Sequence, residues 1–177
     1  MKTFEQRLTA LYDAATAKKA AALAQLQAAK KAAAALNKND ERASAYKAAE
    51  RAYSAAVTDV DTALNADRAS LRAALNADIG KRSLANPDDV VPGAVTLLNS
   101  DILTAADLLA LAERFSANFT MLRLIVSRAR QAMCAATTFR DHAERDALDQ
   151  VVSKCHGFLN ADLIAFDRLA EKLAEQE

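Results

Sequence analysis

The large apolar side chains of the first 36 residues recur at helical spacing and are separated mainly by alanine. Thr3 and Gln6 have the spacing of a capping box, in which each side chain hydrogen-bonds the other residue's backbone amide at the start of a helix. Apolar residues three, four or seven positions apart share one helix face. The pattern predicts one long helix from Thr3 onward, with a stripe made of Phe4, Leu8, Leu11, Ala15, Ala22, Leu26, Ala29, Ala33 and Leu36.

A second long helix is predicted after the polar turn 37–42, ending at Ile79 with Gly80 as its C-terminal cap. Two long helices joined by a short turn fold back antiparallel, and alanine at their contact lets the axes approach closely. We expect both Ala29 and Ala56 to lie in this contact, so that a leucine at either position would force the axes apart. The stripe of the second helix consists of Tyr46, Ala49, Tyr53, Ala56, Val60, Leu64, Leu71 and Leu75.

Residues 80–94 contain both prolines and two of the three glycines, which makes this segment the best boundary in the chain. Asn86 and Pro87 have the form of an N-cap and a first-turn proline, and Asp88 and Asp89 follow as first-turn acids. The segment is therefore expected to be a linker that contains one short helical turn.

Three more helices are predicted after the linker. Thr104 and Asp107 cap the first, which ends near Phe115, and Asn118 caps the second, which extends to Met133. Thr138 and Asp141 cap the third, which reaches the C-terminus as one helix. Its stripe consists of Leu148, Val151, Cys155, Phe158, Leu159, Phe166, Leu169 and Leu173.

The predicted fold is therefore all-α, a long Ala-rich antiparallel helical hairpin followed by a small three-helix C-terminal region. The predicted domains are a hairpin over 1–79, a linker over 80–94 and a helical bundle over 95–177. Composition agrees, because about a quarter of the residues are alanine while glycine, proline and aromatic residues are scarce.

The segment 99–125 concentrates large apolar side chains in an otherwise alanine-rich chain. Helical spacing predicts that Leu108, Leu111, Leu122 and Ile125 form the core of the bundle. Phe119, Met121, Arg123 and Arg130 are candidates for an interaction surface, because aromatic residues, methionine and arginine are enriched at interfaces. Phe119 shares the arginine face, so the alternative is that it covers the hairpin internally.

A segment of the form "SDILTAADLLALAERFSANFTMLRLI", preceded by an alanine- and charge-rich helical region, resembles a group of small helical proteins encoded by tailed phages and prophages of Gram-positive gut bacteria. The similarity is clearest over residues 95–125 and is compositional over 1–79. The motif contains no catalytic residue, so the resemblance implies a phage setting and no defined activity.

Enzyme chemistry is not expected. His142 and His156 are the only histidines, and neither lies in a spacing that supplies three or four metal ligands. Cys155 and His156 are adjacent and point about 100° apart on a helix, so they do not face each other, and Cys155 is expected as a buried thiol. We predict no catalytic, metal or cofactor-binding residues.

The chain carries 23 basic and 23 acidic residues, so no overall basic excess favours nucleic acid. Residues 1–79 carry 12 basic and 9 acidic side chains, and Lys19 and Lys30, 11 residues apart, share one helix face. The usual explanation is a solvated face, and the functional alternative is a shallow basic surface for an acidic partner. Direct nucleic-acid binding is not expected, because no aromatic residues interleave with the lysines.

The predicted function is non-enzymatic protein–protein interaction in phage virion structure or assembly. The alternative is an accessory protein that binds and inhibits a host nuclease or CRISPR effector complex. Phage structural proteins or such a host complex would be the partners, and self-association is expected. No secretion signal or membrane span is recognised, and the cysteines fit a reducing compartment, so the expected location is the host cytoplasm or the virion.

Overall fold

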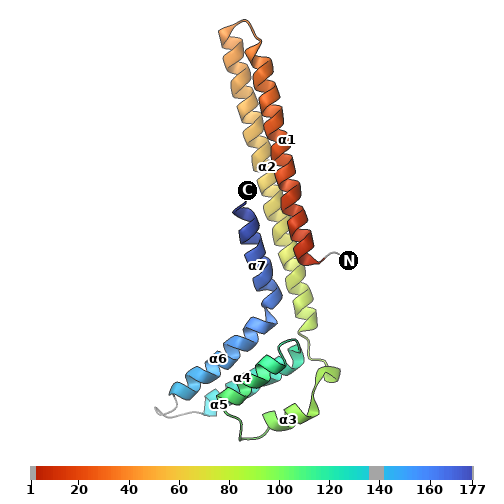
Figure 1. Cartoon of the computed structure of the whole chain (residues 1–177), viewed down its shortest axis with the longest axis vertical. Helices are drawn as coiled ribbons and strands as arrows, with labels where there is room; N and C mark the ends of the chain where they lie inside the picture. The colour runs from red at the N-terminus through yellow and green to blue at the C-terminus, as the bar shows by residue number, and fades with distance from the viewer. Residues whose placement is uncertain (1–2, 136–141, 177) are drawn as a thin grey trace. The chain divides into compact units, whose positions relative to one another are not determined.

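A computed structural model describes residues 3–135 and 142–176 (Figure 1). Within these ranges the secondary structure is helical and contains no strand, which confirms the all-α prediction. The elements are α1 (Phe4–Ala34), α2 (Asn39–Arg82), the 3₁₀ turn η1 (Pro87–Asp89), α3 (Pro92–Leu98), α4 (Ala105–Arg114), α5 (Phe119–Ala135), α6 (His142–Leu159) and α7 (Ala161–Ala174).

The predicted N-caps are present wherever the structure describes them. Thr3 with Gln6 and Thr104 with Asp107 form capping boxes at α1 and α4. The Asn118 side chain accepts a hydrogen bond from the Met121 amide at 2.9 Å and begins α5. The predicted helical turn after Asn86 is η1. The predicted cap at Thr138 and Asp141 lies outside the described residues.

The predicted end of α2 at Gly80 is wrong, since the helix continues to Arg82 and the glycine has no positive φ. A glycine inside a helix costs only about 1 kcal/mol relative to alanine, and the next turn is still hydrogen-bonded, with the Ser83 amide donating to Ile79 at 2.8 Å. Helix α3 was not predicted. It begins at Pro92, inside the expected linker, and ends at Leu98, beyond it.

The single C-terminal helix is also wrong, because α6 and α7 are separated at Asn160. The Asn160 side-chain amide donates a hydrogen bond to the His156 carbonyl oxygen at 2.9 Å. Asparagine side chains compete with the helical backbone for its own hydrogen bonds, which accounts for a break at this position. The predicted stripe therefore belongs to two helices.

The chain divides into two compact units. Unit 1 comprises Met1–Leu75 and Ala165–Glu177, and unit 2 comprises Asn76–Ile164. The sequence-based division had placed residues 165–177 with the bundle, whereas this grouping places them with the first 75 residues.

In unit 1, α1 and α2 are joined by contacts in antiparallel register. Lys19 pairs with Asp61 at 2.9 Å and Lys30 with Glu50 at 2.8 Å. The Arg68 guanidinium donates to the Tyr12 hydroxyl at 3.4 Å. The two residue numbers add to the same total, 80, in all three pairs. A constant total is expected when two neighbouring helices run in opposite directions.

The C-terminal part of α7 packs in unit 1 as well. The Tyr12 hydroxyl donates to the Ala170 carbonyl oxygen at 3.2 Å, and the Arg72 guanidinium makes two hydrogen bonds of 2.8 Å to Asp167. These bonds lower the pKa of the Asp167 carboxyl. The buried apolar side chains of unit 1 are Leu8, Tyr12, Ala15, Ala22, Ala33, Leu64, Leu71, Leu75, Phe166 and Ala170.

Of the stripe predicted for the first helix, Phe4, Leu11 and Leu26 are half-buried and two positions are open to solvent. Ala29 and Leu36 are both exposed. Ala29 still borders a space of about 130 Å³ between α1 and α2, together with Ala22 and Ala56. The alanine contact therefore closes at Ala22 and is open to solvent at Ala29.

The core of unit 2 is built on α5, which packs against α4 and α6, while α3 and η1 pack on α5. Three of the four predicted core leucine and isoleucine residues, Leu108, Leu122 and Ile125, are buried, and Leu111 is half-buried against this core. The Thr120 hydroxyl accepts a hydrogen bond from the Asn86 amide at 3.0 Å, and the Asn118 side chain donates to Asp89 at 2.7 Å. These two bonds attach the η1 segment to α5.

Candidate functional site

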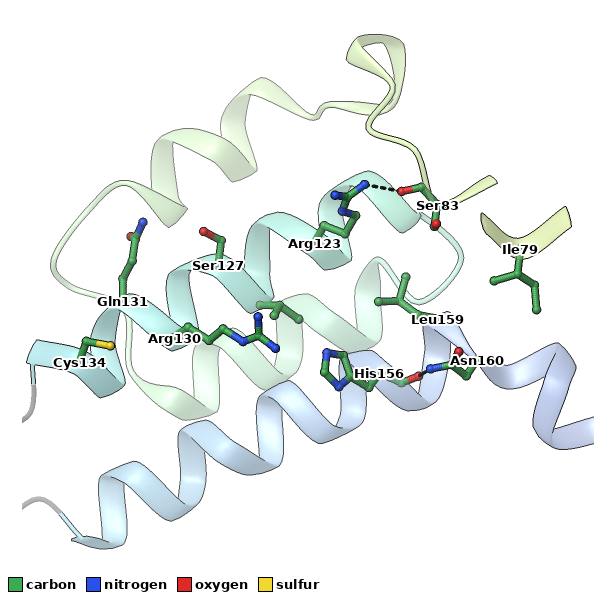
Figure 2. A pocket seen from close by; sticks show the side chains of 11 residues that line it. Ile79, Ser83, Arg123, Ser127, Arg130, Gln131, Cys134, His156, Leu159 and Asn160 are labelled. Carbon is green, nitrogen blue, oxygen red and sulfur yellow. Dashed lines mark hydrogen bonds between the residues drawn. The ribbon is translucent and has the colours of Figure 1, made fainter. Parts of the chain in front are cut away.

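An open groove of about 830 Å³ lies along α5 in unit 2, and Figure 2 shows its side chains. Helix α5 provides one wall, α6 and Asn160 provide the other, and the last turn of α2 contributes at one end. The lining residues are Ile79, Ser83, Arg123, Val126, Ser127, Arg130, Gln131, Cys134, His156, Leu159 and Asn160.

Arg123 and Arg130, two of the predicted surface residues, both line this groove. They are seven residues apart on α5 and therefore lie on the same helix face. Both are exposed. The Arg123 guanidinium donates a hydrogen bond of 2.5 Å to the Ser83 carbonyl oxygen, just beyond the end of α2. This bond caps one of the carbonyls that a helix C-terminus leaves unpaired.

The groove is basic over the described part of its lining, which includes two arginines and one histidine and no aspartate or glutamate. Its apolar surface comes from Ile79 and Val126, which are buried, and from the half-buried Leu159. A groove of this composition can hold a carboxylate at its arginines and an apolar side chain on its floor.

His156 reaches into the groove from α6, and Cys134 lies at the opposite end of the α5 wall (Figure 2). No spacing in the sequence associates either residue with Arg123 and Arg130. Helical periodicity assigns residues to a face of their own helix, whereas the pairing of that face with α6 depends on tertiary packing.

Phe119 does not line the groove and makes an internal contact. Its ring is half-buried, and the Arg82 guanidinium lies 5.7 Å from the ring centre. Arg82 also pairs with Asp78 at 3.2 Å and with Asp162 at 2.6 Å. The contact between Phe119 and the C-terminal turn of α2 supports an internal role for this ring over a role in an interaction surface.

Met121 does not belong to an interaction surface, because its side chain is 0% exposed and lies in the core of unit 2. The interface statistics that favoured methionine take no account of position on the helix. Met121 lies four residues before Ile125, which places both side chains on the buried face of α5.

The two lysines of the predicted basic surface are engaged in unit 1. Lys19 and Lys30 form the ion pairs with Asp61 and Glu50 on α2, and the Lys30 ammonium lowers the pKa of the Glu50 carboxyl. Surface ion pairs contribute little stability, with a median of about 0–1 kcal/mol. They do neutralise the charge that an acidic partner would otherwise meet at these two positions.

The two cysteines have different environments. Cys155 is buried in the core, as expected from its place in the apolar stripe, and burial raises the pKa of its thiol to about 11. Cys134 is exposed. Among the described residues, no group of three or more histidine, cysteine and carboxylate side chains is placed to hold a metal ion.

A second feature was missed by the sequence analysis. Most of the exposed large apolar side chains of unit 2 lie between residues 84 and 102, in Leu84, Val91, Leu97 and Ile102. Leu84 is 66% exposed and Ile102 is 76% exposed, which is far more than a leucine or isoleucine in a core contact retains. The hydrophobic residues of this segment are visible in the sequence. Leu84 and Val91 fall in the expected linker, and Leu97 and Ile102 fall in the expected bundle, so their exposure was not predicted.

In the described part of the chain, no helix has both the length and the hydropathy needed to cross a membrane. Comparisons of the chain with protein-family models, with curated proteins and with solved structures give no match.

Proposed function

We propose that this protein is a non-enzymatic interaction protein that serves the structure or assembly of a phage virion. The observation that carries the interaction role is the exposed apolar segment 84–102, in which Leu84, Val91, Leu97 and Ile102 present large side chains to solvent. These four large apolar side chains lie within 19 residues of sequence, and a protein partner that covers them would remove apolar surface from water. The phage setting comes from the resemblance of residues 95–125 to small helical phage proteins.

The proposed architecture is a helical hairpin in unit 1, with residues 84–102 of unit 2 providing the partner contact. Virion structural proteins are the proposed partners, and the alanine-rich helices are proposed to support self-association. The protein would act in the host cytoplasm and in the assembled particle. No catalytic step, cofactor or membrane is part of this proposal.

The test is to purify virions from cells that produce the protein with Leu84→Ser and Ile102→Ser together, and to measure its amount per particle. We expect the native protein in the particles and a loss of at least tenfold in the double variant. Leu23→Ser is the matched control, because Leu23 is also exposed but lies on α1 in unit 1.

Absence of the native protein from particles would overturn the virion role. Co-purification with a host nuclease or CRISPR effector complex in that case would support the inhibitory role instead. Incorporation that is unchanged in the double variant would show that residues 84–102 are not the contact segment.

A further inference from the structure

We propose that the groove along α5 binds an acidic amphipathic helix of a partner protein, with two partner carboxylates placed on Arg123 and Arg130. The inference rests on the proposed interaction function for its choice of a protein ligand. It adds a second contact site, distinct from residues 84–102, and the chemistry of the segment that fills it.

The charge of the groove points to a carboxylate ligand. Three arginines of the chain pair with carboxylates: Arg72 with Asp167, Arg82 with Asp78 and Asp162, and Arg128 with Asp101. Arg130 is exposed and forms no such pair with any carboxylate of the described residues. Arg123 uses one hydrogen bond on the Ser83 carbonyl, and a guanidinium has five N–H donors, so it retains donors for a ligand.

The floor of the groove adds a requirement for apolar side chains in the ligand. Val126 lies between the two arginines in the sequence of α5, and Ile79 and Leu159 complete an apolar surface beside it. A free inorganic anion would use the arginines and leave this surface uncovered. An amphipathic segment uses both, because its apolar residues pack on the floor while its acids reach the rim.

The spacing of the arginines defines the spacing of the acids. Seven residues at a rise of 1.5 Å separate Arg123 from Arg130 by roughly 10 Å along α5. A partner helix that lies along α5 matches this with two acidic residues seven positions apart. Apolar residues three and four positions after the first acid then fall between them on the same face.

The occupant is a different protein and not another copy of this chain. No two acidic residues of this sequence are seven positions apart, so none of its helices presents the required pair. Nucleic acid is disfavoured as well, because residues 76–164 carry 9 basic and 11 acidic side chains, and none of the described residues that line the groove is an aromatic on which a base could stack.

The test uses the full chain and a fluorescein-labelled helical peptide with glutamates at positions i and i+7 and leucines at i+3 and i+4. Anisotropy titrations at low salt are expected to show saturable binding. A peptide with glutamine in place of both glutamates should bind at least about tenfold more weakly, as should the Arg130→Gln protein, since each change removes charge-assisted hydrogen bonds.

Two controls make the result specific. Arg145→Gln removes an exposed arginine on α6 that does not line the groove, and it should leave the affinity unchanged. A peptide with its glutamates at i and i+5 has the same charge on different faces and should bind as weakly as the glutamine peptide. Equal binding of all three peptides, or full binding by the Arg130→Gln protein, would overturn the proposal.

A 20-nucleotide single-stranded DNA is titrated in parallel. If this DNA binds through Arg130 and the acidic peptide does not bind, the proposal of a protein ligand is overturned. The outcome is separate from the virion test. Peptide binding by a protein that is absent from virions would support the groove and reject the virion role. Virion incorporation without peptide binding would do the reverse.

Discussion

The guanidinium of Arg82 lies over the ring of Phe119, 5.7 Å from its centre, and the same guanidinium pairs with Asp78 and Asp162. One side chain at the end of α2 therefore contacts α5 and the start of α7, all within unit 2. The arrangement explains why an aromatic residue lies on the charged face of α5, because the Phe119 ring makes a cation–π contact with Arg82 of the same unit.

The first prediction concerns this contact. Arg82→Ala should lower the free energy of unfolding by about 1–2 kcal/mol, because it removes one cation–π contact and two partly exposed ion pairs. A double-mutant cycle with Phe119→Leu, measured by urea denaturation, should give a coupling of about 0.5–1 kcal/mol. A coupling of zero would mean that the ring and the guanidinium do not interact in solution.

The second prediction concerns the alanine contact of unit 1. Ala22 is buried, so Ala22→Leu should destabilise by about 1–3 kcal/mol through overpacking. Ala29 is exposed beside the same small space, so Ala29→Leu should change the melting temperature little, and Ala56→Leu, at a half-buried position, should fall between them. If thermal denaturation instead showed the largest loss for Ala29→Leu and the smallest for Ala22→Leu, the tight contact between α1 and α2 would lie at Ala29 and not at Ala22.

The third prediction tests whether the C-terminal residues stabilise unit 1. Phe166 is 1% exposed among the buried residues of that unit, so Phe166→Ala should cost about 3–5 kcal/mol by leaving a cavity. Ile164 is 41% exposed two residues earlier, and Ile164→Ala is the matched control with an expected change below about 0.5 kcal/mol. If both variants lost a similar free energy of unfolding, Phe166 would contribute no more to stability than the exposed Ile164.

The fourth prediction concerns the thiols. At pH 8 an aromatic disulfide reagent should modify Cys134 rapidly in the native protein and modify Cys155 only after denaturation, since Cys155 is buried and its pKa is raised to about 11. Cys134→Ser should abolish the fast phase. A fast phase that persists in this variant would show that Cys155 is accessible.

The raised pKa of Cys155 also has a consequence for stability. The folded state holds the thiol proton more tightly than the unfolded state, so this contribution is complete below the unfolded pKa and decreases as the pH rises toward about 11. The stability of Cys155→Ala should therefore fall less steeply than that of the native protein above pH 9, measured by denaturant titration at several pH values.

The fifth prediction concerns the start of α4. The Thr104 hydroxyl and amide hydrogen-bond Asp107 and lower the pKa of its carboxyl. Thr104→Ala should cost about 0.5–2 kcal/mol. Thr62→Ala, at an exposed position inside α2, is the control and should be neutral or stabilise by up to about 0.7 kcal/mol, because alanine has the higher helix propensity. Because the folded pKa of Asp107 is lowered, its stabilising effect is present at neutral pH and is lost on acidification, and Asp107→Asn should flatten that loss in acid denaturation.

The sequence by itself determined what depends on neighbouring residues. The caps at Thr3, Thr104 and Asn118 are hydrogen bonds between residues three apart, so their spacing is visible in the chain. The buried positions Leu8, Leu122 and Ile125 follow from helical periodicity for the same reason. The all-helical fold follows from these local preferences acting together.

Tertiary structure decided what depends on residues far apart in the chain. Periodicity placed Arg123 and Arg130 on one face of α5, but the groove exists only because α6 and the end of α2 lie beside that face. Periodicity also could not show that Lys19 and Lys30 would meet carboxylates on α2. Each of these outcomes is set by which distant helix supplies the neighbouring side chains, and local spacing carries no information about that choice.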